Sequence, residues 1–443
     1  MSTELKRSLT LYGLTMIAIG STIGSGIFRT PGKIALQMHQ PEFVIALWVL
    51  GGLVALTGAL TFAEMGSMFP GAGGLYVYLR EAYGDTVGFL YGWFILFIST
   101  SGSIAALSVV CAEHILYLTG ETDTGLVTPL ALGITVFLTI VNLFGVRIGG
   151  WMANLFTGAK LAGLALIIVV GIFYFRPEVP AANAASSFAN SAPTNWMSAF
   201  AAAFVGVLWS YGGFQHASYL AGETQHAQRN VPRAMILGAS VVTLVYVLAN
   251  VAYMRLLPIE TIAQSKTVAA DAMRTAFPWG GSLMAFLIVL STFGTTAIYC
   301  MSAPRIYYAM AKDGIFFKQL AELHPRWHTP VKAILIQAAW SVILLLVWGT
   351  FGDLIDYVTF MDWIGLAMVG TAIFVFRKHR PDAERGYRTV LYPLTPLVFI
   401  ILSGLFIVLQ FADNPKHSGA GIAVVAVGWV VYYFFFRRQK TAG

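Results

Sequence analysis

Long apolar segments separated by short polar stretches make up almost the whole chain. Twelve of them reach about the 20 residues that an α-helix needs to cross the hydrocarbon core of a bilayer. The pattern therefore predicts an all-α membrane protein with twelve spanning helices. The predicted spans cover residues 10–36, 43–69, 85–118, 127–146, 150–175, 196–222, 232–257, 279–311, 331–350, 353–376, 391–412 and 419–436.

Composition supports this class, because 57% of the residues are hydrophobic and only 11% are charged. A soluble domain carries about 25% charged residues. The first apolar segment runs from Leu9 well past Leu36, which is too long for a signal peptide. Cys111 and Cys300 both lie in apolar segments and are expected to be buried thiols, not a disulfide or metal site. No GxGxxG, P-loop, HExxH or GxSxG pattern occurs, so we expect no cofactor and no ATP-driven pump.

The distribution of positive charge predicts the orientation. The chain has 27 Lys and Arg residues. With the N-terminus in the cytoplasm, 19 of them fall on inside segments and 7 on outside segments, and Lys160 lies within a span. Because cytoplasmic loops are enriched in Lys and Arg, both termini are expected to be cytoplasmic. Of the outer connections, Arg176–Asn195 is expected to be a loop, and Pro258–Pro278 a short surface helix.

Two glycine-rich breaks interrupt apolar segments, one in each half of the chain. The first is Gly24–Phe28, within the run Tyr12–Ile34, and the second is Tyr211–Phe214, within the run Trp196–Leu220. A break inside a bilayer is tolerated only where the freed backbone groups are buried or line a cavity. Paired breaks in the two halves therefore indicate the binding site of a secondary transporter.

The chemistry of the first break favours an anion, since the second half-helix would begin with the free N–H groups of Ser25 and Gly26. The half-helix before it would end in free carbonyls, which suit an ammonium group. Trp209 lies beside the second break and could close over a bound solute. The alternative interpretations are close helix packing by small residues and an ordinary packed aromatic ring.

Lys160 lies in the otherwise apolar stretch Ala153–Val170. A lysine at this depth costs about 3 kcal/mol on insertion scales, so an intramembrane lysine indicates function by default. The alternative is a lysine in a wet crevice with a structural partner. A hydroxyl cluster in span 8 is weak by itself, because such groups often bond to their own helix; its members are Ser291, Thr292, Thr295 and Thr296.

Four acidic residues lie near predicted span ends. Glu64 and Glu223, at the cytoplasmic ends of spans 2 and 6, could form an inner gate of ion pairs or only stabilise the topology. Asp356 and Asp362 are placed near the outer end of span 10, where exposure is favoured over a proton-relay role.

Four stretches resemble the L-amino acid transporter family of the amino acid–polyamine–organocation superfamily, in its prokaryotic form. They are Ile23–Gly32 (IGSGIFRTPG), Thr61–Gly84 (TFAEMGSMFPGAGGLYVYLREAYG), Leu208–Pro232 (LWSYGGFQHASYLAGETQHAQRNVP) and Leu290–Gly314 (LSTFGTTAIYCMSAPRIYYAMAKDG). The resemblance implies a five-plus-five inverted repeat with helices 1 and 6 broken. The expected units are residues 1–176 (spans 1–5), 195–378 (spans 6–10) and 390–437 (spans 11 and 12).

The resemblance also implies which groups bind the substrate. Backbone N–H groups at the first break would bind its carboxylate, and carbonyls at both breaks would bind its ammonium group. The donors would be Gly24, Ser25 and Gly26; the acceptors would be Thr22, Trp209 and Gly212.

Lys160 matches the span-5 lysine of the family, whose ammonium group takes the place of the sodium ion of sodium-coupled relatives. It would bridge carbonyls around residues 20–23 to hydroxyls near Ser291 and Thr292. Two features depart from the family. His226-Ala227 replaces the usual Asn-Pro after Glu223, which leaves the gate geometry open. The loop Leu118–Val127 lacks the cysteine by which animal members join a single-span glycoprotein, so no disulfide-linked partner is expected.

The sequence predicts a sodium-independent exchanger of neutral L-amino acids in the inner membrane, not an enzyme and not a nucleic-acid-binding protein. Its expected partners are an amino acid substrate and the lipid bilayer. One alternative is a proton-coupled or cationic amino acid or polyamine carrier, but neither Gly20–Arg29 nor Val205–Gln215 supplies a carboxylate for a cationic substrate. The other is a non-transporting membrane sensor, which would not need two broken helices.

Overall fold

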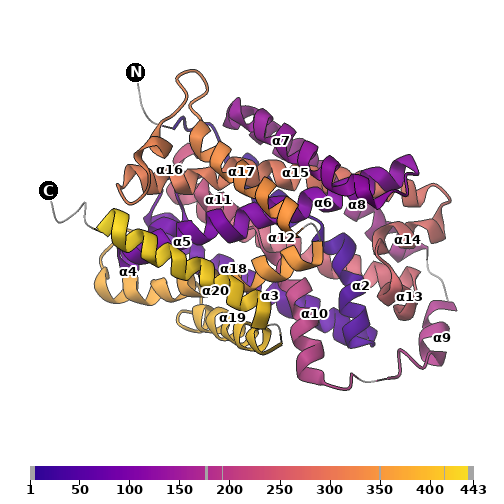
Figure 1. Ribbon diagram of the computed structural model, residues 1–443. Coiled ribbons are helices and arrows are strands. Elements are labelled where there is room, and N and C mark those ends of the chain that lie inside the picture. The colour runs from indigo at the N-terminus through magenta and orange to yellow at the C-terminus, as the bar shows by residue number, and fades with distance from the viewer. Residues whose placement is uncertain (1–4, 175–177, 192, 349–350, 414, 438–443) are drawn as a thin grey trace.

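The computed structural model describes residues 5–174, 178–191, 193–348, 351–413 and 415–437, and every element there is a helix (Figure 1). The first half contains α1 (Leu11–Thr22), α2 (Gly26–Met38), α3 (Pro41–Met68), α4 (Leu75–Tyr83), α5 (Asp85–Phe94), η1 (Ile95–Ser99), α6 (Thr100–Thr119), η2 (Thr124–Leu126), α7 (Val127–Leu143), α8 (Val146–Phe173) and α9 (Glu178–Ala185). The second half contains α10 (Trp196–Tyr211), α11 (His216–Tyr219), η3 (Ala221–Glu223), α12 (Ala227–Leu256), α13 (Ile259–Gln264), α14 (Val268–Ala276), α15 (Gly280–Ser302), α16 (Pro304–Lys312), η4 (Lys318–Ala321), α17 (Val331–Trp348), α18 (Phe351–His379), α19 (Leu394–Asp413), α20 (Pro415–Val431) and η5 (Tyr432–Phe436).

The predicted twelve-span, all-α fold is confirmed. Within the described residues, 11 helices or helix pairs are long and apolar enough to cross a membrane, and Val331–Val347 in α17 is a shorter apolar helix. The observed bounds differ from the predicted ones by a few residues. For example, the long third span covers Asp85–Thr119 and includes the π-helical turn η1.

Spans 1 and 6 are broken where the glycines predicted. The first span stops at Thr22 and resumes at Gly26; the second stops at Tyr211 and resumes at His216. The second half of span 1, α2, contacts the first half of span 6, α10. The first half of span 1, α1, contacts the second half of span 6, α11. The later half of span 1 thus lies beside the earlier half of span 6, so the two spans run in opposite directions, as an inverted repeat requires.

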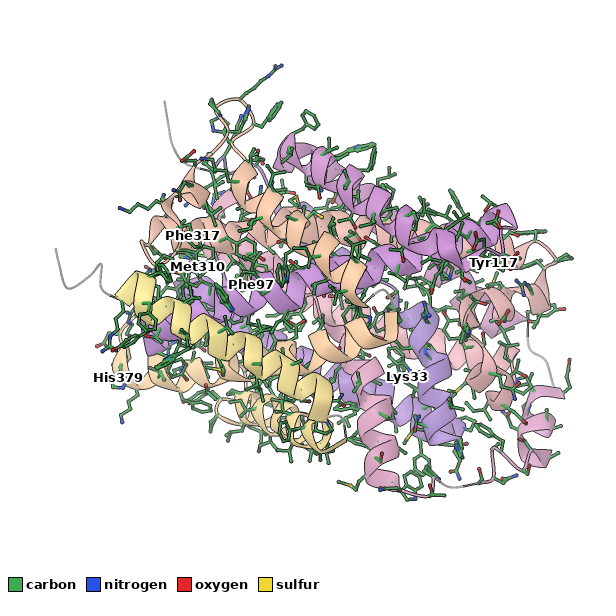
Figure 2. All side chains as sticks on the ribbon, in the orientation of Figure 1. Lys33, Phe97, Tyr117, Met310, Phe317 and His379 are labelled. Carbon is green, nitrogen blue, oxygen red and sulfur yellow. The ribbon has the colours of Figure 1, made fainter. Side chains whose placement is uncertain are left out.

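The broken spans and the third span form the interior, and the last two spans lie outside. The most apolar windows of Leu11–Met38 and Asp85–Thr119 are 83% and 94% buried, whereas that of Ser418–Phe436 is 22% buried. Figure 2 shows the third span crossing the bundle, with Phe97 near its middle and Tyr117 at one end. The site lies where these interior spans meet.

The two ends of the bundle differ in what they carry (Figure 1). The described chain begins and ends beside α4 and α16, and we call this the terminus end. Helices α9, α13 and α14 lie at the opposite end, called the far end. The two ends of the described chain therefore lie on one side of the bundle.

Two expectations for the far-end connections need revision. Arg176–Asn195 is not all loop, because α9 forms within it. Pro258–Pro278 folds into two short helices, α13 and α14, where one was expected. The three-unit division of the chain stays a prediction.

Candidate functional site

The first break presents unused hydrogen-bond donors. No acceptor among the described residues binds the backbone N–H groups of Ser25 and Gly26, and the Ser25 hydroxyl is buried without a partner. The Gly24 N–H differs from the expectation, since it donates to the carbonyl of Thr22 at 2.9 Å. A buried donor without a partner costs about 1–3 kcal/mol, so this end of the break is prepared for an anionic acceptor.

The second break presents unused acceptors. The helix α10 ends because Gly212 adopts extended backbone angles and Gly213 has φ +130°, which non-glycine residues rarely adopt. The Gly213 N–H turns to the side chain of Gln215 at 2.9 Å. No donor in the described part of the chain reaches the carbonyl oxygens of Trp209 and Gly212. These carbonyls suit an ammonium group.

The two breaks touch each other. The hydroxyl of Ser21 donates to the carbonyl of Gly213 at 2.8 Å. The approach at Gly26 is closer still, because a Cβ atom there would lie 2.7 Å from the Cα atom of Ser210. Glycine is therefore required at residue 26 by the packing of span 1 on span 6.

The side chain of Tyr246, on α12, contacts both breaks. The sequence pattern did not identify this residue. Its hydroxyl lies 3.1 Å from the carbonyl oxygen of Thr22 and 3.0 Å from that of Ser210. The carbonyl of Thr22, an expected substrate acceptor, thus already accepts from the Gly24 N–H and from Tyr246. A tyrosine in an apolar helix gave no local signal that would separate this role from packing.

Lys160, on α8, lies between the first break and α15 and is fully buried. Its ammonium nitrogen is 3.0 Å from the carbonyl oxygen of Gly20 and 2.6 Å from that of Ile23. On the α15 side it contacts the carbonyl oxygen of Ser291 at 3.2 Å and the hydroxyl of Thr295 at 2.8 Å. Neutral oxygens thus surround the buried cation, as they would surround a metal ion.

The hydroxyl partners differ in part from the expected ones. The Ser291 hydroxyl points to the first break and lies 3.2 Å from the carbonyl oxygen of Gly24. Thr292 does not take part, because its hydroxyl donates to the carbonyl of Ile288 in its own helix at 2.9 Å. Thr295 takes its place. Residues 291 and 295 share a helix face, whereas residue 292 is turned by about 100°.

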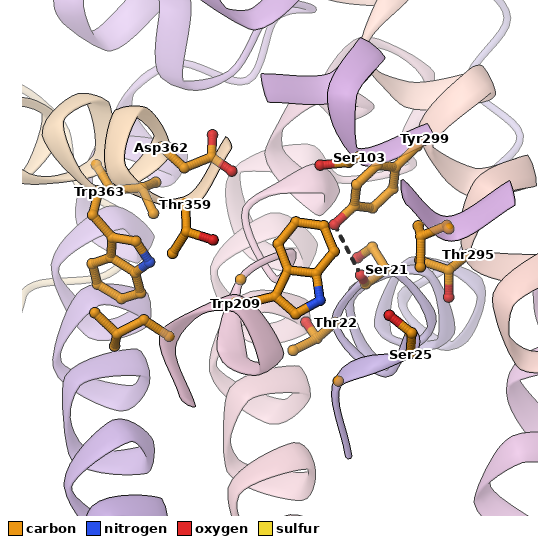
Figure 3. Close-up of a pocket in the computed structure, with 16 residues that line it drawn as sticks. Ser21, Thr22, Ser25, Ser103, Trp209, Thr295, Tyr299, Thr359, Asp362 and Trp363 are labelled. Carbon is orange, nitrogen blue, oxygen red and sulfur yellow. Dashed lines mark hydrogen bonds between the residues drawn. The ribbon is translucent and has the colours of Figure 1, made fainter. Parts of the chain in front are cut away.

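A cavity of about 20 Å³ is lined by residues of both breaks (Figure 3). Trp209 lies across it, with Thr22 and Ser25 on one side of the indole and Thr359 and Asp362 on the other. The lining residues are Ser21, Thr22, Gly24, Ser25, Gly26, Ser103, Leu107, Leu208, Trp209, Gly212, Thr295, Tyr299, Thr359, Asp362, Trp363 and Leu366. This volume holds about one water molecule and no amino acid, so the site is closed in this conformation.

The expectation that Asp362 is exposed at the outer end of its span is wrong. It lines the central cavity and is only half-buried there (Figure 3). The helix α18 begins at Phe351, so residue 362 lies about 16 Å along it. The sequence around the two breaks contains no carboxylate, and Asp362 on α18 supplies one to the cavity. The Asp356 side chain lies outside the described residues.

Ion pairs close the terminus end. Glu223 and Arg305 form a bidentate pair at 2.9 and 3.0 Å, with side chains 2% and 1% exposed. Glu64 pairs with Arg377 at 2.7 Å and Arg385 at 3.0 Å. Both glutamates expected at this end thus have buried or half-buried arginine partners.

The N-terminal segment ties span 1 to the same region. Ser8 and Leu9 donate their N–H groups to the carbonyl of Glu223, both at 2.9 Å. His226, which departs from the family pattern, caps α12 with φ +47°.

A thinner seal closes the far end. The guanidinium group of Arg29 forms an ion pair with Glu113 and lies 4.5 Å from the ring centroid of Phe351. Phe351 in turn meets the indole of Trp209 edge to face at 6.2 Å. Arg29 and Glu113 remain 24% and 35% exposed, so this seal is wetter than the one at Glu223.

Comparison with known proteins identifies a family and several relatives of this chain. The profile of a family described as amino acid permease matches residues 9–435. The serine/threonine exchanger SteT of Bacillus subtilis is 33% identical over 97% of each chain. The b(0,+)-type amino acid transporter 1 of Mus musculus is 28% identical, covering 99% of this chain and 90% of its own. The Asc-type amino acid transporter 1 of the mouse is 29% identical, over 98% and 82%.

Proposed function

The chain belongs to the amino acid permease family, and from that premise we propose that it exchanges neutral L-amino acids across the membrane without sodium. The observation that carries the proposal is the pairing of unused groups in the cavity. Ser25 and Gly26, with free N–H groups, line the same cavity as Trp209 and Gly212, with free carbonyls. Donors and acceptors in one cavity match the carboxylate and ammonium groups of a zwitterion.

Sodium independence follows from Lys160. Its ammonium group already bridges the first break and α15 through the carbonyls of Ile23 and Ser291. A soluble cation would have to displace it to bind the same oxygens. Lys160 thus supplies the charge that would otherwise couple transport to sodium.

Alternating access would open the two seals in turn. The Arg29–Glu113 seal is thin and half-exposed, and we propose that it opens to the outside. The Glu223–Arg305 seal would open to the cytoplasm, where both termini are placed by the positive-inside rule. The relatives named as exchangers and transporters support this cycle.

The test uses the purified chain alone in proteoliposomes, because no disulfide-linked partner is expected. Labelled serine, threonine, alanine, valine, leucine, phenylalanine and lysine are each offered to vesicles with and without internal serine. We expect uptake of small neutral amino acids only into loaded vesicles, at equal rates in sodium and choline buffer. Equal uptake into empty vesicles would contradict exchange. A steep sodium dependence would contradict the role of Lys160.

A cationic substrate is the second candidate, and Asp362 is the observation that favours it. The lysine in the substrate panel tests this alternative directly. Strong lysine exchange with weak serine exchange would favour it.

A further inference from the structure

Asp362 is the one charged side chain among the residues that line the central cavity. Its carboxylate forms no ion pair with any described residue, and the titratable groups around it are phenols. These phenols belong to Tyr91, Tyr219 and Tyr299. The hydroxyl of Ser99, in the π-helical turn η1, is its hydrogen-bonding neighbour in the protein.

A carboxylate has two oxygens and about four lone-pair positions. A single hydroxyl leaves most of this capacity free to accept from a donor in the cavity. Figure 3 shows the Asp362 carboxylate on the side of α18 that is nearer to Trp209. A donor that arrives in the cavity is therefore the partner that this group lacks.

The position of Asp362 relative to the breaks determines which part of a substrate would donate a hydrogen bond to it. Ser25, whose N–H group has no acceptor among the described residues, lies on the other side of the Trp209 indole from Asp362 (Figure 3). An amino acid held there by its carboxylate and ammonium groups would direct its side chain toward α18. Asp362 is thus opposed to the side chain and not to the zwitterionic head.

Resting on the proposed function, we propose that Asp362 selects amino acids whose short side chain carries a hydrogen-bond donor. A β-hydroxyl or β-amino group donates to the carboxylate, and an alkyl group of the same size leaves it unpaired. The rings of Trp209, Trp363 and Tyr299 limit the length of the side chain. Serine, threonine and 2,3-diaminopropionate fit this description, and alanine, valine and leucine do not.

Threonine and valine provide the sharpest test, because they have the same shape and differ by one hydroxyl group. In competition with labelled serine exchange, native protein should prefer threonine over valine by about tenfold or more, since a site built for a hydroxyl rejects the analogue without it. Asp362→Ala should reduce this preference to about twofold or less. Asp362→Asn keeps one acceptor oxygen and should retain an intermediate preference. Asp382→Asn, in an exposed loop, is the matched control and should behave as native protein.

The outcomes separate this inference from the proposed function. If native protein exchanges alanine and serine but does not prefer threonine over valine, the selectivity role of Asp362 is wrong and the exchange function stands. An unchanged preference for threonine over valine in Asp362→Ala would also overturn it. If Asp362→Ala does not fold, stabilisation of native protein by threonine but not valine in detergent supports the inference, and equal stabilisation by both contradicts it.

Discussion

The two broken helices differ in what holds them open. At the first break a buried cation, Lys160, binds the carbonyls of Gly20 and Ile23 from outside the helix. At the second break the groups that take part within the described residues are neutral, namely the side chains of Gln215, Ser21 and Tyr246. The first break is thus fixed to α8 and α15, whereas the second is fixed to the first and to α12. We infer that the first break is the anchor of the site and the second the part that adapts to the substrate.

The largest effect is expected from forcing the breaks apart. In Gly26→Val, the added side chain would overlap Ser210, whose Cα atom would be 2.7 Å from the new Cβ. Overpacking of this kind costs about 1–3 kcal/mol, so exchange should fall about 100-fold or below detection while the protein still inserts. Gly24→Ala is the control, because its Cβ would meet only side-chain atoms of Leu107 at 3.1 Å and Thr295 at 3.6 Å. Native exchange and binding in Gly26→Val would contradict the close contact.

Removing the Lys160 ammonium group should have the next largest effect on exchange. Lys160→Ala takes the ammonium group from four acceptors, and exchange in proteoliposomes should fall about 10- to 100-fold, since each 1.4 kcal/mol corresponds to a factor of ten. Lys378→Ala removes an exposed lysine from the end of α18 and should leave exchange unchanged. A fully active Lys160→Ala protein would show that the first break needs no anchor.

Trp209 tests the adaptable break. Trp209→Ala removes the ring that crosses the cavity and meets Phe351, so exchange should slow by about tenfold with little change in melting temperature. Trp429→Ala, at an exposed position on α20, controls for the loss of a tryptophan. Equal exchange by the two variants would mean that Trp209 only packs.

The smallest effect is expected at the link between the breaks. Tyr246→Phe removes one hydroxyl that reaches Thr22 and Ser210, and a hydrogen bond of this kind is worth about 0.5–1.5 kcal/mol. Exchange should fall about two- to tenfold. Tyr253→Phe, on the same helix, loses a buried hydroxyl that has no partner and should behave as native protein. Equal impairment of exchange in Tyr246→Phe and Tyr253→Phe would contradict a specific role for the Tyr246 hydroxyl.

The sequence was sufficient for the spans and both breaks, because apolar length and glycine placement are local signals. It also identified Lys160, since an isolated lysine in an apolar stretch has no inexpensive explanation. Thr295 could have been preferred over Thr292 from helical spacing alone, as residues 291 and 295 share a face. The hydrogen bond between Gly24 and Thr22 depends on the turn of the backbone at the break, which spacing does not define.

Asp362 and Tyr246 show a different limit. Both act on the breaks from helices far away in sequence, α18 and α12. An aspartate about eleven residues into a span is predicted as exposed or central according to where the span is taken to begin. The predicted start at residue 353 gave it an outer position, and only the packing of α18 against the site places it at the cavity.

Lys160 is a cation that never leaves the protein. A dissolved ion bound in its place would be released on the other side in every cycle, and each unit charge falling through 100 mV would supply about 2.3 kcal/mol for accumulation. A tethered ammonium group makes no such passage, so the ion gradients of the cell perform no work through it. In the exchange proposed above, every amino acid that enters is balanced by one that leaves. Such a protein changes the composition of the intracellular pool and leaves its total size to other systems.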